Sequence, residues 1–134
     1  MTINITKDSI DIGLVTDNID AMNTFYQNIL GLELEAVLDM PGGMQMTRLL
    51  AGTTVVKLVT FPEAPEGQNP PGGLGGGRGI RYFTITIDNL EEAVQECVAA
   101  GYANPVPVRQ SRPGVNIAMI EDPDGNWVEL LQLS

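Results

Sequence analysis

The feature that most constrains this chain is that its two halves repeat the same order of predicted elements. Three pairs of matching segments carry the repeat. Asp17-Asn18-Ile19 returns as Asp88-Asn89-Leu90, 71 residues later, and Gly31 returns as Gly101, 70 residues later. Residues 54–58 (TVVKL) correspond to 126–130 (NWVEL), 72 residues later. Self-similarity at one period indicates a structural unit that has been duplicated.

Each half is predicted to contain a strand, a helix and three further strands. Alternating apolar residues indicate strands, and apolar residues at helical spacing indicate helices. The first half has strands at 10–16, 32–38, 44–50 and 54–61 and a helix at 18–30, which Asp17 or Asn18 caps and Gly31 ends. The second half has strands at 80–87, near 104–109, at 115–121 and at 126–133, and a helix at 90–100.

The chain is therefore predicted to be one α+β domain, residues 1–134, built from two βαβββ modules. The first module covers about 9–61 and the second about 80–133. A Pro- and Gly-rich loop at 62–79 joins them and lacks the pattern of a nucleotide-binding glycine loop. This loop is interpreted as a flexible linker, as a lid, or as a hinge at which modules exchange between subunits.

Composition excludes several classes of function. The 134 residues include no histidine, so a Ser-His-Asp triad and a histidine metal site are impossible. The formal net charge of −10 argues against nucleic-acid and membrane-surface partners. No apolar run is long enough to span a bilayer, no export signal is visible, and the single cysteine, Cys97, fits a buried helix position. A cytoplasmic location is expected.

Three segments carry a resemblance to a known family: IDIGLVTDNIDAMNTFYQNILGLE at 10–33, ITIDNLEEAVQECVAAG at 85–101 and IEDPDGNWVELLQ at 120–132. Together they resemble the vicinal oxygen chelate superfamily, which includes glyoxalase I, bleomycin-resistance proteins and extradiol dioxygenases. The resemblance implies paired βαβββ modules that form a curved mixed sheet around a cleft. It leaves the activity open, since this fold is used by lyases, isomerases, dioxygenases and drug-binding proteins.

In metal-using members of this family each module supplies two ligands, one on its first strand and one on its last. The resemblance places those positions at Asp11, Lys57, Tyr82 and Glu129. The repeat spacing relates the same residues, because Asp11 and Tyr82 are 71 apart and Lys57 and Glu129 are 72 apart. Only Glu129 is a residue of the usual ligand types, and the lysine ammonium would repel a cation. No metal is therefore expected, with a divalent ion on an altered ligand set as the alternative.

These four residues suggest a metal-free acid–base site. Either Glu129 or Asp11 would be the base that removes a proton next to a carbonyl, as in a lyase or an isomerase. Lys57 would stabilise the enolate, and Tyr82 would donate a proton. The competing interpretation is a partly buried salt bridge, in which Lys57 pairs with Asp11, Glu129 or both and closes a vacant site.

Strand alternation from these positions adds candidate ligand-binding residues: Val59, Thr84 and Trp127. Met46, on a neighbouring strand, and Arg112, which could hold an acidic group, complete the set. Such a surface suits an apolar small molecule with one polar end. Core packing or a dimer interface for Trp127, packing for Met46 and simple solvation for Arg112 are the alternatives.

Two further hypotheses stand beside the metal-free enzyme. One is a non-catalytic protein that sequesters a cationic drug, as bleomycin-resistance proteins do, and a net charge of −10 favours a cationic ligand. The other is a metalloenzyme of the glyoxalase or dioxygenase type. The resemblance also makes a homodimer the expected assembly.

Overall fold

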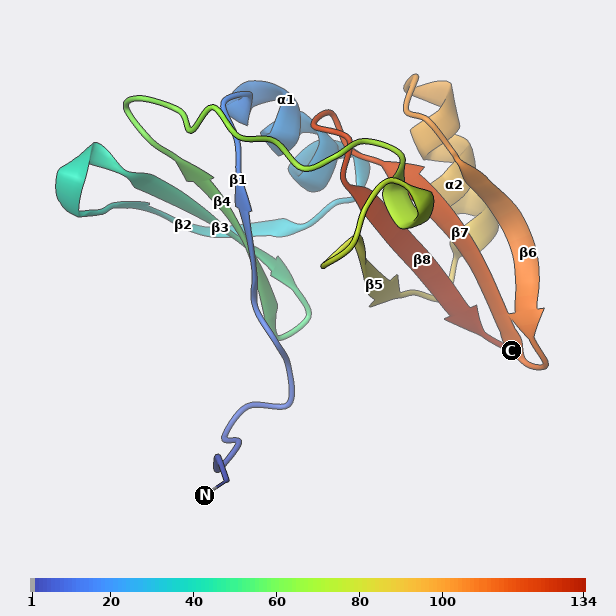
Figure 1. The fold of residues 1–134 in the computed structure, drawn as a ribbon. Coiled ribbons are helices and arrows are strands. Elements are labelled where there is room, and N and C mark those ends of the chain that lie inside the picture. Colours follow the sequence, from blue (N-terminus) through green and yellow to red (C-terminus); the bar gives the residue numbers. More distant parts are fainter. Residues whose placement is uncertain (1) are drawn as a thin grey trace.

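A computed structural model describes residues 2–134, and its first module follows the predicted order closely (Figure 1). A turn of π-helix at Thr24–Ile29 continues the first helix, as the bond from Leu30 N–H to the Phe25 carbonyl shows. Together the two segments fill the predicted 18–30 helix, and Gly31 follows with a φ of 79°. The elements are β1 (Ile12–Val15), α1 (Ile19–Asn23), β2 (Glu33–Asp39), β3 (Gln45–Ala51) and β4 (Thr54–Thr60), with a 3₁₀ turn at Pro41–Gly43.

The second module repeats the first, and its elements also lie close to the predicted ranges. The largest difference is at β6, which begins and ends two to three residues later than predicted. A 3₁₀ turn at Gly73–Gly75 lies in the loop between the modules. The elements are β5 (Tyr82–Thr86), α2 (Leu90–Ala99), β6 (Val106–Arg112), β7 (Val115–Glu121) and β8 (Trp127–Leu133).

Each module forms its own four-stranded mixed sheet, and the two sheets have the same topology. The strand order is β1-β4-β3-β2 in the first sheet and β5-β8-β7-β6 in the second. The parallel pair has the same register in both, since Ile12 lies opposite Val56 and Phe83 lies opposite Val128. These two pairs are related by the offsets of 71 and 72 read from the sequence, so the α+β fold of paired βαβββ modules is confirmed.

One face of each sheet packs against helices, and the two modules share a single core. Figure 1 shows α1 between the sheets and α2 against the second sheet. The fully buried core side chains come from both helices and from the helix-facing side of β3, β4, β7 and β8. Phe25 contacts Tyr102 edge to face, with ring centroids 4.8 Å apart. None of the helices in residues 2–134 is long and apolar enough to cross a membrane.

A buried hydrogen bond ties the first module to the last turn of the second. The Tyr26 hydroxyl donates to Asp122 Oδ2 at 2.6 Å, and both residues are almost fully buried. Burial first, and then the charge of Asp122, raise the pKa of Tyr26 well above its usual value. Tyr26 therefore remains a protonated donor, and the contact orients the two modules.

Candidate functional site

The opposite face of each sheet carries no helix, and the predicted site residues lie there. We call these surfaces the helix-free faces. On the first sheet Lys57 lies opposite Arg48 and Val59 lies opposite Met46, while Val56 and Leu58 point into the core. On the second sheet Glu129 lies beside Thr84 and opposite Met119. Strand alternation therefore assigned these side chains to one face of each sheet correctly.

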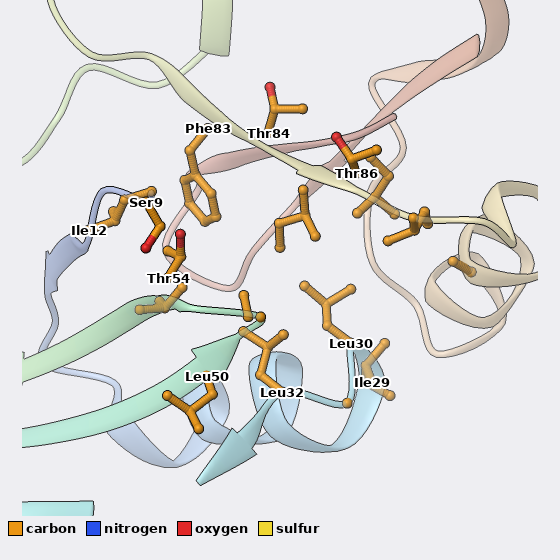
Figure 2. Close-up of a pocket in the computed structure, with 18 of the residues that line it drawn as sticks. Ser9, Ile12, Ile29, Leu30, Leu32, Leu50, Thr54, Phe83, Thr84 and Thr86 are labelled. Carbon is orange, nitrogen blue, oxygen red and sulfur yellow. The ribbon is translucent and has the colours of Figure 1, made fainter. Parts of the chain in front are cut away.

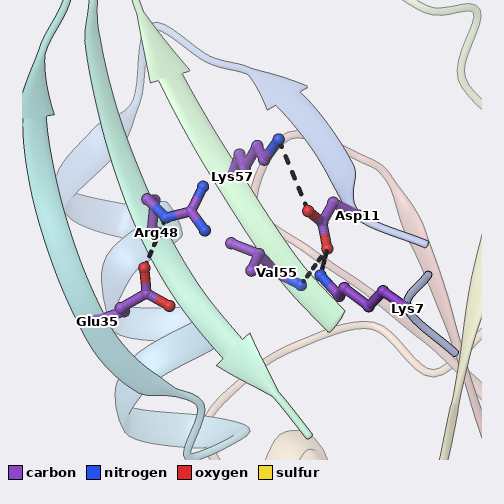
Figure 3. Close-up of polar contacts among 6 residues, drawn as sticks. All are labelled: Lys7, Asp11, Glu35, Arg48, Val55 and Lys57. Carbon is purple, nitrogen blue, oxygen red and sulfur yellow. Dashed lines mark hydrogen bonds and ion pairs between the residues drawn. The ribbon is translucent and has the colours of Figure 1, made fainter. Parts of the chain in front are cut away.

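Asp11, directly before β1, lies between the ammonium groups of Lys7 and Lys57 (Figure 3). Its Oδ1 accepts hydrogen bonds from Lys7 Nζ at 2.7 Å and from the Val55 N–H at 2.9 Å, and its Oδ2 lies 3.8 Å from Lys57 Nζ. The hydrogen bond from Lys7 is the main reason that the pKa of Asp11 is lowered, followed by the bond from Val55. A carboxylate with a lowered pKa is a weaker base. Asp11 is therefore suited to holding cationic side chains in place.

Basic side chains gather on this helix-free face although the chain as a whole is acidic. Lys7, Arg48 and Lys57 are three of its seven basic residues. Arg48 Nε is paired with Glu35 Oε1 at 2.8 Å on the neighbouring strand. Sequence reasoning missed Lys7 and Arg48. Arg48 could have been found from its strand position, because it is two residues after Met46 and therefore lies on the same face of the strand.

The second sheet holds Glu129 in a different environment. Glu129 Oε1 accepts a hydrogen bond from the Thr84 hydroxyl at 2.8 Å. Tyr82 lies two residues before Thr84 on β5, on the same face, and is 40% exposed. In the part of the chain from residue 2 to 134, no ion pair reaches Glu129.

The four candidate residues thus fall into two sets, Asp11 with Lys57 and Tyr82 with Glu129. The partner of Lys57 is Asp11. Across residues 2–134 no hydrogen bond or ion pair joins one set to the other.

The donor set does not fit the metal that the fold family implies. Across the described residues, 2–134, no three Asp, Glu, Cys or His side chains lie close enough to hold one ion. Asp11 is already engaged with two ammonium groups, and Lys57 brings a positive charge to a ligand position. A divalent ion needs at least three ligands in a catalytic site.

The predicted ligand-binding residues also divide between the sheets. Met46 and Val59 are neighbours on the first sheet, and Thr84 and Trp127 belong to the second. Arg112 is exposed at the β6–β7 turn, opposite Val115, whereas Trp127 begins β8 at the other end of the sheet. Six strand residues separate those two ends, which is about 20 Å. A small molecule on Trp127 would therefore not contact Arg112.

The loop at 62–79 is anchored onto Trp127. Figure 1 shows it running from the end of β4 across to the front of β8. Arg81 Nε donates to the Gly73 carbonyl at 2.6 Å and Arg81 Nη2 to the Pro70 carbonyl at 2.7 Å. Gly73 is buried against the indole, so closely that a Cβ there would lie 2.1 Å from ring carbons. The loop is thus a cap over Trp127, held by Arg81.

Gly73→Ala is expected to detach this cap. The new methyl group would overlap the indole, and the φ of +56° is unfavourable for any side chain. Trp127 is the single tryptophan of the chain, so its fluorescence should shift to the red and acrylamide should quench it more strongly. Because only an exposed loop is released, stability should change by less than about 1 kcal/mol. Gly75→Ala is the matched control, since a Cβ there meets nothing within 4 Å. Equal quenching of both variants would contradict the cap.

Comparison with known proteins agrees with this architecture. The family model "Glyoxalase/Bleomycin resistance protein/Dioxygenase superfamily" matches residues 9–130. Protein YwkD of Bacillus subtilis, which is uncharacterized, is 27% identical over 124 residues, covering 90% of this chain and 93% of YwkD.

Several solved structures have the same fold at low sequence identity. A glyoxalase family protein from Bacillus cereus has a TM-score of 0.83 at 16% identity, with 99% of this chain and 98% of that one covered. Trypanothione-dependent glyoxalase I of Leishmania major has a TM-score of 0.70 at 18% identity, covering 95% and 87%. TnmS3, an antibiotic binding protein from Streptomyces sp. CB03234, has a TM-score of 0.68 at 22% identity, covering 99% and 100%. The chain belongs to the glyoxalase/bleomycin resistance protein/dioxygenase superfamily.

Proposed function

We propose that the protein is a metal-independent enzyme that transfers a proton on a small carbonyl compound, with Glu129 as the general base. The observation that supports this proposal is the contrast between the two carboxylates at the family's ligand positions. Asp11 is bound by two lysines, whereas Glu129 accepts one hydrogen bond from a neutral hydroxyl. A carboxylate oriented in this way keeps an oxygen available for a substrate proton.

The proposed reaction needs no group other than side chains. Glu129 takes a proton from the carbon next to the carbonyl, the C–H electron pair moves into the new carbon–carbon double bond, and the carbonyl oxygen becomes an enolate. Lys57 and the Tyr82 hydroxyl stabilise that oxygen. In an α-hydroxy carbonyl compound the enolate oxygen takes up the proton of the α-hydroxyl group, and return of the first proton to the former carbonyl carbon then gives isomerisation. Loss of a leaving group from the next carbon gives elimination.

Within one chain Lys57 and Glu129 lie on different sheets, so we propose that a second copy completes the site. The first sheet of one subunit would face the second sheet of its partner. An apolar side chain exposed on the first of these faces supports such an assembly: Val15, which lies opposite Val59, is 54% exposed.

The test uses the purified full chain in D₂O and follows loss of α-proton signals by proton NMR. The probes are α-hydroxy ketones, beginning with dihydroxyacetone, and the hemithioacetal of methylglyoxal with a simple thiol. Exchange above the uncatalysed rate should persist unchanged in EDTA. Exchange that appears only when a divalent metal is added would overturn the proposal, and so would the absence of exchange with every probe.

Sequestration of a drug-like molecule is the second candidate, and Trp127 favours it. The indole lies on the same face of β8 and its neighbour β7 as the apolar side chains of Ile117 and Met119, which are themselves buried. Its neighbour in fold, TnmS3, is described as an antibiotic binding protein. An aromatic ligand that binds and is recovered unchanged would support this function over catalysis.

A further inference from the structure

A second concave region lies between the two modules, on the side of the sheets that faces the helices. Figure 2 shows this cavity, which has a volume of about 930 Å³. That volume falls in the range of pockets that hold small organic ligands. Glu129, Lys57, Tyr82 and Trp127 are not among the residues of 2–134 that line it. The cavity is therefore distinct from the site of these four residues, although Thr84, which donates to Glu129, lies at its edge.

The walls come from both modules and carry more apolar than polar surface. In Figure 2 Phe83, Leu30 and Leu32 surround the space, whereas the hydroxyls of Thr84 and Thr86 point away from it. Val56 and Leu130, both part of the core, also line it. A molecule in this cavity would contact both modules at once and would gain free energy mainly by burying apolar surface.

The polar groups around the cavity define the charge of its ligand. Asp8 and Glu96 stand exposed at its rim, and no lysine or arginine of residues 2–134 lines it. An anionic ligand would meet only negative charge, and the net charge of −10 adds to that repulsion. A cation would be attracted by both carboxylates.

Among the described residues, Ser9 contributes a buried, unpaired hydroxyl to the wall of the cavity. Its Oγ is shielded from solvent and has no hydrogen-bond partner in residues 2–134. Buried polar groups are almost always hydrogen-bonded, since leaving one unpaired is costly. Ser9 lies at the wall beside Thr54 and Ile12 (Figure 2).

We propose that this cavity binds a hydrophobic amine, with its apolar body between the modules and its ammonium group at Glu96, at the α2 end of the cavity. This site does not depend on the proposed proton-transfer chemistry. Glu129 lies outside it, so either proposal can fail while the other stands.

The experiment compares three probes that share one alkyl chain: decylamine, decanol and decanoate. Binding to the full chain is measured by isothermal titration calorimetry at pH 7, below the micellar concentration of each probe. Decylamine should bind about fivefold more tightly than decanol, as expected for partly screened carboxylates, and decanoate should bind most weakly. Equal affinities for decylamine and decanoate, or no binding of decylamine or decanol, would overturn the proposal.

Matched variants on α2 test whether the probe binds in the cavity. Ala93 lines the cavity and Ala99 lies outside it on the same helix, so Ala93→Phe should abolish decanol binding while Ala99→Phe should leave it unchanged. Glu96→Gln should weaken decylamine about threefold without changing decanol, and Glu92→Gln should change neither. Equal effects of Ala93→Phe and Ala99→Phe would place the probe elsewhere and refute the site.

Discussion

Replacing Asp122 with alanine is expected to lower the free energy of unfolding by about 3–5 kcal/mol. Asp122 is 3% exposed, and its carboxylate accepts four hydrogen bonds, from the Tyr26 hydroxyl, the N–H groups of Asp124 and Asn126, and the Asn126 side chain. Alanine would remove every acceptor at once and leave the buried Tyr26 hydroxyl unpaired. Because domains of this kind are stable by roughly 5–15 kcal/mol, a large part of the stability would be lost.

Tyr26→Phe is the informative control for this prediction. It removes one donor and leaves the three bonds within the turn in place, so the loss should be smaller, about 2 kcal/mol. Urea denaturation followed by circular dichroism measures both variants. If the free energy of unfolding of Asp122→Ala lay within about 1 kcal/mol of the wild-type value, the turn and the contact between modules would not depend on this carboxylate.

Replacing Glu129 with glutamine is expected to reduce α-proton exchange by about 100- to 10,000-fold, the usual contribution of a general base. Glutamine keeps the size of the side chain and an oxygen that can accept from Thr84, so the fold should be unaffected. The amide cannot take up a proton at neutral pH. Rates are measured by NMR in D₂O on the probe that the wild type exchanges fastest.

Three further variants separate catalysis from general effects of charge. Glu92→Gln on the exposed side of α2 should leave the rate unchanged. Lys57→Met should slow exchange, because the enolate would lose its cation. Asp11→Asn should have a smaller effect than Glu129→Gln, since Asp11 acts through the lysines that it holds. A Glu129→Gln protein with the full wild-type rate would disprove the assigned role.

Much of the fold could be predicted from the sequence because the repeat carries non-local information. Alternation placed each strand within a few residues, and the offsets near 71 related positions in the two modules. The parallel pairing of β1 with β4 and of β5 with β8 obeys those offsets residue by residue. The same reasoning placed Lys57 and Glu129 on the helix-free faces. It could not say which acid would pair with Lys57, because that depends on how the modules are oriented.

The sequence by itself determined the two βαβββ modules, their registers and the faces on which candidate residues lie. These properties follow from short-range periodicity and backbone geometry, which local sequence encodes. The tertiary structure decided which distant groups meet: Tyr26 with Asp122, 96 residues apart, Lys57 with Asp11, and Gly73 with Trp127. Such contacts depend on the packing of modules and loops against one another, where a shift of a few ångströms makes or breaks a hydrogen bond. No pattern along the chain specifies that packing.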